Sequence, residues 1–420
     1  MRFVTGPITM LLIIKYLTPT DQGFYYAFAG VAGIQVFLEA GFAVSIAQFT
    51  AKEFAGLRFT KSGFLTGKSE NLSRLRSIYQ KAFRYYSAMA VVLTFGIGIG
   101  GYVFFSSRPS EGVHWQIPWV VVAVCMGFQF LLTPFWAILE GCNRVADVAT
   151  YYFWMTLIGF TASALGFVIT QSLDVVIFTS VASLLTGYAY IFGKWLKLRS
   201  QVIRPFRKHQ QVAWFKDIWG FQWRIAIVWG AKYILFFSMA PIAMAVGTPE
   251  LAGRVGITFQ LAFFACSLAS SFTNTKIPRW GAMISNNNCQ SFYSEWLRFS
   301  KLHVLASTTF MVVLLVVFSL ATLLVPGISS RFLTLEAFAI LAIAMVAHAF
   351  WLCFSHFFRS GRIEPYTGLT VIAAVTYLML LYLWKHWPNA LGIASAFFVT
   401  NAIAAFFAYF IWTQRKHTIL

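Results

Sequence analysis

The chain has 420 residues, of which 59% are hydrophobic and only 11% are charged, and its mean hydropathy is +0.70. A soluble domain carries about 25% charged residues, so the composition excludes the soluble classes and indicates an all-α polytopic membrane protein. The formal net charge of +19 would suit a nucleic-acid partner, but the distribution of these charges along the chain has another explanation, given below.

A helix needs about 20 apolar residues to cross a bilayer, and twelve apolar stretches of roughly that length follow one another along the chain. Their approximate limits are residues 3–17, 24–47, 82–105, 117–139, 149–170, 175–193, 218–246, 255–273, 302–325, 335–357, 366–384 and 390–412. The first stretch is short for a full crossing. We expect it either to begin before Met1 in a longer chain or to enter the bilayer tilted.

Lysine and arginine are distributed unequally between alternate loops. Of these 32 residues, 25 fall on the side that includes Met1 and five fall on the opposite side. Cytoplasmic loops of membrane proteins carry such an excess, so we expect a multi-pass protein of the inner (cytoplasmic) membrane with both termini in the cytoplasm. Topology and attraction to anionic membrane lipids account for the positive charge, and no nucleic-acid partner is needed.

Two apolar spans are preceded by amphipathic stretches. Before the third span, apolar residues recur at intervals of three and four: Leu72, Leu75, Tyr79, Ala82, Phe83 and Tyr86. A similar stretch, residues 292–299, precedes the ninth span. This spacing is typical of helices that lie in the membrane interface.

Short motifs recur at corresponding places in the two halves of the chain. The three pairs are Thr18-Pro19-x-x-x-Gly23 with Thr248-Pro249-x-x-x-Gly253, Lys81-x-x-Arg84 with Arg298-x-x-Lys301, and Gly141 followed by Arg144 with Gly361 followed by Arg362. Each match is weak alone, but together they predict two six-helix lobes, residues 1–200 and 201–420. An even number of crossings separates the lobes, which gives parallel repeats about a pseudo-two-fold axis along the membrane normal.

The sequence contains no pattern typical of an enzyme or a metal site. The five cysteines show no spacing suited to metal ligands. No paired carboxylates, nucleophile elbow or Walker motif stands out. We therefore expect no metal, no cofactor, no catalytic residue and no ATPase activity.

The seventh span carries two cations, Arg224 near its start and Lys232 near its centre. A charge facing lipid at this depth costs between roughly 3 and more than 10 kcal/mol, so we expect both to face protein or a wet cavity and to line a path for an anion. Snorkelling to an interface or a structural ion pair is the alternative. Arg2 falls opposite Lys232 in the repeat and is either a matching cation of the first lobe or a positive-inside residue.

Glu39 lies near the middle of the second span, where carboxylates are rare. It is predicted to pair with a cavity cation, to take up a coupling proton, or to serve a structural role only. Gln35, one helical turn earlier, and Gln260 on the eighth span are candidate cavity residues, although core hydrogen bonding is the more common use of such groups. His348 in the tenth span is more often an interior histidine than a proton relay.

Several stretches resemble a known family. The opening residues 2–9, the run Tyr16-Leu-Thr-Pro-Thr-Asp-Gln-Gly23 leading into 37–42, the run 222–226 and the run 276–278 are similar to bacterial polysaccharide flippases of the Wzx type, which handle O-antigen for lipopolysaccharide. That superfamily also holds MATE drug exporters and lipid II flippases.

The resemblance implies a central cavity between two lobes, alternating access, and a polyprenyl pyrophosphate-linked oligosaccharide as cargo. Arg224, Lys232 and Arg2 would then attract the pyrophosphate, because guanidinium groups suit phosphate oxygens. Glycosyltransferases and the polymerase of the same pathway are the implied partners.

Three alternatives stay open. A MATE-like cation antiporter would place acidic residues in the cavity, and only Glu39 is available. A membrane polymerase or ligase would need a large outer loop, whereas the longest here is 106–116. A membrane scaffold that transports nothing is the third.

Overall fold

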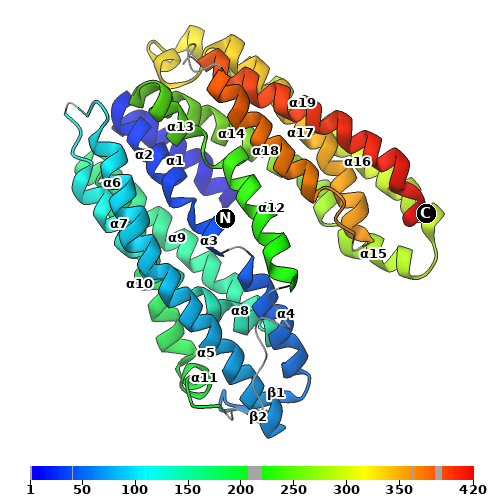
Figure 1. The fold of residues 1–420 in the computed structure, drawn as a ribbon. Coiled ribbons are helices and arrows are strands. Elements are labelled where there is room, and N and C mark those ends of the chain that lie inside the picture. The colour runs from blue at the N-terminus through cyan, green and yellow to red at the C-terminus, as the bar shows by residue number, and fades with distance from the viewer. Residues whose placement is uncertain (1, 40, 111, 207–219, 362, 384–389) are drawn as a thin grey trace. The chain divides into compact units, whose positions relative to one another are not determined.

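The computed structural model describes residues 2–39, 41–110, 112–206, 220–361, 363–383 and 390–420, and these residues are almost entirely helical (Figure 1). Contacts divide the chain into two compact units. The first contains Met1–Asp21 and Val31–Gly230, and the second contains Gln22–Gly30 and Ala231–Leu420. The predicted division into residues 1–200 and 201–420 stays a prediction.

The helices of the first unit are α1 (Arg2–Tyr16), α3 (Gln35–Glu39), α4 (Phe42–Phe54), α5 (Ser69–Val91), α6 (Gly98–Ser106), α7 (Gln116–Phe130), α8 (Thr133–Gly141), α9 (Val145–Thr170), α10 (Val175–Lys194) and α11 (Leu196–Val202). Those of the second unit are α13 (Met239–Val246), α14 (Pro249–Asn274), α15 (Ile277–Ser285), α16 (Cys289–Leu324), α17 (Leu335–Ser360), α18 (Thr367–Leu383) and α19 (Ala390–Arg415). Two helices contribute residues to both units, α2 (Pro19–Ala32) and α12 (Gly220–Phe236).

The predicted all-α membrane fold is confirmed. Within the described residues, nine helical stretches are long and apolar enough to cross a membrane, and a tenth is formed by a bent pair, Ala226–Phe236 with Met239–Val246. Two shorter apolar helices, Thr5–Tyr16 and Thr367–Leu383, correspond to the first and eleventh predicted spans. These stretches follow the order of the twelve predicted spans, and the chain is a multi-pass membrane protein.

The first unit has an aromatic-rich core. Leu75, Ile78 and Tyr86 of α5 are fully buried in it, together with Ile138 and Leu139 of α8. Residues 72–86 form most of α5 and turn much of their apolar side inward, where α4, α8 and α11 pack against the helix. Their predicted position in the membrane interface stays a prediction.

A short β-hairpin interrupts the first unit between α4 and α5, and no sequence pattern predicted it. β1 (Leu57–Phe59) pairs antiparallel with β2 (Leu65–Gly67), with Arg58 opposite Thr66. Gly63 lies in the turn at φ +86°, a conformation that glycine adopts without strain.

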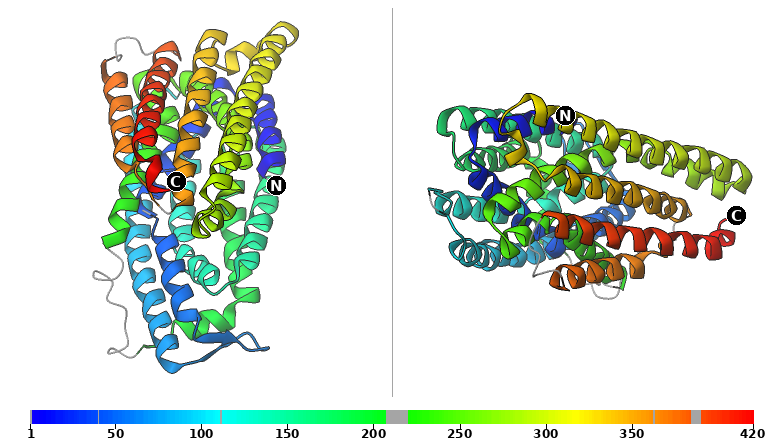
Figure 2. Two further views of the ribbon diagram at one scale, coloured as in Figure 1. Left: turned by 90° about the vertical axis from the view of Figure 1, so that its right-hand side faces the viewer. Right: turned by 90° about the horizontal axis from the view of Figure 1, so that it is seen from above.

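In the second unit, α17 packs against α14, α16 and α19. Figure 2 shows α16, α17 and α19 side by side as long helices. Residues 292–299 lie near the start of the 36-residue α16, where Phe292 and Trp296 are buried, and their expected position in the interface stays a prediction. Residues 22–30 of α2 also pack into this unit, where Gly30 lies against the Pro241 ring.

Candidate functional site

Lys232 lies on α12 and belongs to the second unit, where it is half-buried. Phe236, one helical turn later, packs edge-on against the His348 ring of α17, with centroids 4.8 Å apart. Coulombic interactions connect the ammonium group with Arg359 and Glu364 at the end of α17. Glu364 already accepts two hydrogen bonds from Arg359, at 3.0 and 3.2 Å, and no described carboxylate of the unit forms an ion pair with Lys232.

The helix that carries Lys232 is broken soon after it. α12 ends at Phe236, α13 begins at Met239, and their axes differ by 52°. Pro241 in the first turn of α13 has no N–H group and cannot continue the helical hydrogen-bond pattern from α12. Lys232 lies one helical turn before this break. In many transporters, broken helices of this kind contribute to binding sites.

A second polar group lies inside the same unit, between α14, α16 and α17. The Thr273 hydroxyl lies 2.9 Å from Nδ1 of His356 and 3.4 Å from Nδ1 of His303. The same hydroxyl donates to the Ser270 carbonyl at 3.0 Å. The Cys353 thiol lies 3.4 Å from His303. All of this lies in the buried interior of the unit.

Lys232 interacts electrostatically with His348 and with His356. A positive charge on either buried imidazole would be opposed by the lysine cation and by desolvation. The arrangement provides a positively charged position beside buried, neutral imidazoles within one unit. Of the described residues of the unit, none forms a cluster of three or more potential metal ligands.

His348 has a conventional environment. Its Nδ1 accepts a hydrogen bond from Trp351 Nε1 at 2.9 Å, and the side chain is buried. This environment favours the interior-histidine interpretation over a proton relay at that residue.

Glu39 belongs to the first unit, where it is the last residue of α3 and half-buried. Gln35 begins the same short helix, so the two side chains are one turn apart. The second span breaks here, because Gly41 takes a left-handed conformation (φ 69°) before α4 begins. The Tyr85 hydroxyl donates to the Leu38 carbonyl at 2.6 Å and holds the break against α5.

A second carboxylate is near Glu39. Glu140 of α8 interacts with it by electrostatic repulsion. Glu39 and Lys232 belong to different units, so their predicted pairing stays a prediction.

The other predicted residues are placed only in part. The backbones of Arg2 and Arg224 lie on α1 and α12, but both side chains lie outside the described residues. Gln260 lies on α14 and is exposed on the second unit. Their predicted roles as cavity residues stay predictions.

The buried pair His303 and His356 was missed by the sequence analysis. The sequence contained a signal for them, because each histidine lies in a predicted apolar span, where ionisable residues such as these and Lys232 are rare. What the sequence did not show is that residues 53 positions apart meet at Thr273.

Comparisons with known proteins support the architecture. No family sequence model matches the chain. No curated protein matches it either. Among solved structures, a multidrug resistance MATE family transporter of the MOP superfamily in an inward-facing conformation is similar, with a TM-score of 0.73 and 15% identity over 99% of this chain and 95% of that one.

Two further structures extend this result. The lipid II flippase MurJ in an inward closed conformation gives a TM-score of 0.70 at 12% identity, covering 98% of this chain and 85% of that one. A MOP superfamily transporter from Pyrococcus furiosus, described as having a reversed polarity of its binding pocket, gives 0.53 at 13% identity, covering 99% and 96%. The chain therefore has the fold shared by MATE-type transporters and MurJ.

Proposed function

We propose that the chain is a flippase that moves a polyprenyl pyrophosphate-linked oligosaccharide across the cytoplasmic membrane by alternating access, for the synthesis of surface polysaccharide such as O-antigen. Lys232 attracts the pyrophosphate, the glycan crosses in a wet cavity, and the prenyl tail stays in lipid. Both termini are cytoplasmic in this proposal, and Arg224 and Arg2 contribute further positive charge.

The observation that carries the proposal is the sign of the charge within the second unit. Lys232 forms no ion pair with a described carboxylate there, although Glu364 interacts with it electrostatically. None of the described carboxylates of the second unit lies in the interior of an apolar span. Glu250 and Glu336 are in the first turns of α14 and α17, while Glu295 and Glu364 pair with arginines. A cation without an acidic partner at this depth favours an anionic ligand.

The comparisons add support at the level of the fold. MurJ, which has this fold, is described as a lipid II flippase. One similar transporter is described as having a pocket of reversed polarity, with a different function suggested for it. A protein with this fold can therefore have a binding pocket of reversed polarity, which would suit a cargo of opposite charge.

A second candidate function is the export of organic cations in exchange for an ion. Glu39 and Glu140 in the first unit favour it, because two carboxylates near a helix break could hold a cation or a proton. In this case Glu39 would be the coupling residue and Lys232 would be structural.

One experiment separates the two candidates. The protein is reconstituted in liposomes and tested with a fluorescent polyprenyl pyrophosphate-linked sugar and, separately, with ethidium. The flippase proposal predicts movement of the lipid-linked sugar, strongly reduced by Lys232→Ala and unchanged by Lys301→Ala, which removes an equal charge at an exposed position of α16. Ethidium transport that depends on Glu39, without movement of the sugar, would overturn it.

A further inference from the structure

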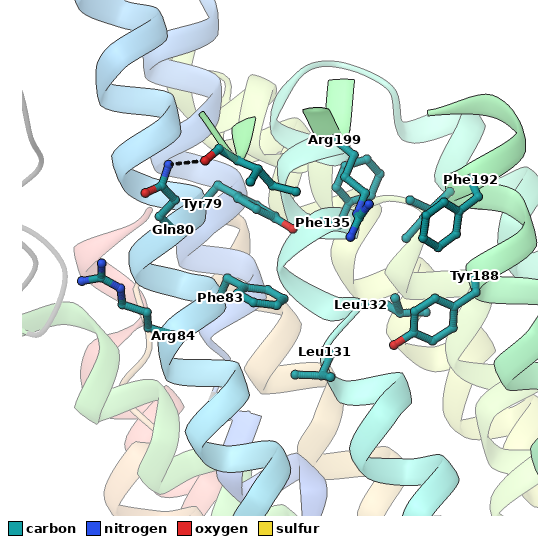
Figure 3. Close-up of a pocket in the computed structure, with 12 residues that line it drawn as sticks. Tyr79, Gln80, Phe83, Arg84, Leu131, Leu132, Phe135, Tyr188, Phe192 and Arg199 are labelled. Carbon is teal, nitrogen blue, oxygen red and sulfur yellow. Dashed lines mark hydrogen bonds between the residues drawn. The ribbon is translucent and has the colours of Figure 1, made fainter. Parts of the chain in front are cut away.

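The first unit contains a groove that the proposed function does not use. It has a volume of about 370 Å³ and is lined by residues of α5, α8, α10 and α11 and of the segment that joins α7 to α8 (Figure 3). This size falls in the range of about 300 to 1,000 Å³ that is typical of small-molecule sites. All lining residues belong to the first unit.

The groove holds a guanidinium group without an acidic partner. Arg199 of α11 points into it in Figure 3, toward the Tyr79 hydroxyl, and Tyr79, Arg199 and Tyr188 interact electrostatically. No described carboxylate of the unit forms an ion pair with Arg199. The guanidinium carbon lies 4.8 Å from the centroid of the Phe192 ring, in a cation–π contact. Arg84 also lines the groove but points away from its centre in Figure 3.

The walls around this cation are aromatic and partly exposed. Tyr188 stacks on Phe192 with centroids 6.3 Å apart, and Tyr79 stacks on Phe83 at 5.9 Å. Phe83, Phe192 and Ile203 are 39%, 48% and 48% exposed, so the rim is open and apolar. An anionic ligand with hydrocarbon chains would contact both the Arg199 cation and the apolar rim, whereas free phosphate would contact only the cation.

The floor of the groove is fixed before any ligand binds. Gln80 of α5 donates to the carbonyls of Ile203 and Arg204 at 3.1 and 2.6 Å, and Arg76 donates to the Gln201 carbonyl at 2.9 Å. These bonds join the end of α11 to α5. Arg199 is therefore presented from a helix that is anchored at its last turn, which lowers the entropic cost of binding.

The surroundings of the groove are basic. α5 and the segment after α11 hold the further basic residues Arg76, Lys81, Arg84 and Arg204, whereas Arg74 and Lys194 are paired with Glu53 and Asp147. A basic surface of this kind attracts anionic lipid headgroups.

We propose that this groove binds an anionic phospholipid of the surrounding membrane, with the Arg199 guanidinium on the phosphate oxygens and the acyl chains along Phe83, Phe192 and Ile203. A guanidinium fork suits two phosphate oxygens, and the tyrosine hydroxyls supply further donors. The groove and Lys232 belong to different units, and binding of the phospholipid is proposed independently of the cargo.

The test is lipid binding to the full chain in a neutral detergent, measured without transport. Dioctanoyl phosphatidylglycerol is titrated, with dioctanoyl phosphatidylcholine and inorganic phosphate in parallel. We expect phosphatidylglycerol to bind tightest. Arg199→Gln should raise its Kd about 10-fold or more, as expected when hydrogen bonds to a charged group are lost. Lys197→Gln removes an equal charge from the same helix outside the groove and should leave the Kd unchanged.

Ile203→Trp provides an independent check, because it narrows the rim at an exposed position and leaves Arg199 in place. It should also weaken phosphatidylglycerol binding, so the proposal stays testable if Arg199→Gln does not fold. Equal binding of phosphatidylcholine, equal binding of free phosphate, or an unchanged Kd in either groove variant would overturn the proposal. A protein that binds phosphatidylglycerol as described but moves no lipid-linked sugar would refute only the proposed function.

Discussion

Gly23 of α2 lies directly against Pro249, the first residue of α14. A β-carbon added at Gly23 would come within 1.8 Å of the Pro249 carbonyl oxygen. These two residues belong to the two copies of the Thr-Pro-x-x-x-Gly motif, and both copies begin a helix. Gln22, beside Gly23, donates to the Gly253 carbonyl at 2.9 Å, so the first copy of the motif packs on the second.

Replacing Gly23 should therefore damage the second unit. Gly23→Ala places a methyl group against backbone that cannot move aside like a flexible side chain, so we expect a cost of about 3 kcal/mol or more. The melting temperature in detergent measures this effect. Gly368→Ala is the matched control, because nothing lies within 4 Å of its added β-carbon. Equal melting temperatures for the two variants would contradict the observed contact.

The histidine pair should depend on Thr273. Thr273→Val keeps the shape of the side chain but leaves His356 without its hydroxyl partner in a buried position, which costs about 1 to 3 kcal/mol. A lower melting temperature is expected. Thr308→Val on α16 removes only an exposed hydrogen bond to the Val304 carbonyl and should have little effect. The account of this cluster fails if both variants melt alike.

The stability of the first unit should depend on the ion pair between Arg74 and Glu53. The Arg74 Nε atom lies 2.8 Å from the Glu53 carboxylate, whose side chain is only 6% exposed. Arg74→Ala leaves a nearly buried carboxylate with a single hydrogen bond from Asn71, at 3.2 Å, and we expect a loss of about 1 to 3 kcal/mol. Lys61→Ala, which removes an exposed cation in the hairpin turn, is the control. Thermal unfolding of the three proteins tests this ranking.

Thiol labelling should distinguish Cys289 from the other cysteines. Cys125, Cys142, Cys266 and Cys353 are buried, whereas Cys289 is half-buried. Burial raises the pKa of the Cys142 thiol to about 12, so the reactive thiolate is a fraction of about 10⁻⁵ at pH 7 and grows tenfold per pH unit up to that pKa. In single-cysteine variants at pH 7, Cys289 should react with maleimide well before Cys142. Similar rates would show that the segment between α8 and α9 is not packed as described.

Features of the fold that depend on residues close together in the sequence could be predicted, and those that depend on tertiary contacts could not. Apolar spans are local features, so hydropathy located the apolar helices. The start of α14 at Pro249, where the Thr248 side chain accepts a hydrogen bond from Leu251 N–H, lies six residues before the predicted span at 255–273. The hairpin at residues 57–67 was missed because its strands are only three residues long. Amphipathic spacing indicated a helix at residues 72–86 but does not reveal whether lipid or protein covers its apolar side, and the packing of α4, α8 and α11 on α5 could not be predicted from it.

The candidate site was predicted to a smaller extent. Lys232 was recognisable because the cost of burying a charge is visible in sequence. The sharing of Thr273 by His303 and His356 depends on how α14, α16 and α17 pack. The groove around Arg199 likewise depends on tertiary contacts, because the helices that line it are separated by long stretches of chain.

The most direct test of the central claim compares two cargo lipids that differ only in charge. Movement of a polyprenyl pyrophosphate-linked sugar and of the same sugar on an uncharged polyprenyl lipid is measured in liposomes containing wild type, Lys232→Arg or Lys232→Gln. The account predicts a preference for the pyrophosphate lipid in wild type and Lys232→Arg, and a preference reduced about tenfold or more in Lys232→Gln. An equal preference in Lys232→Gln at normal protein levels would contradict it.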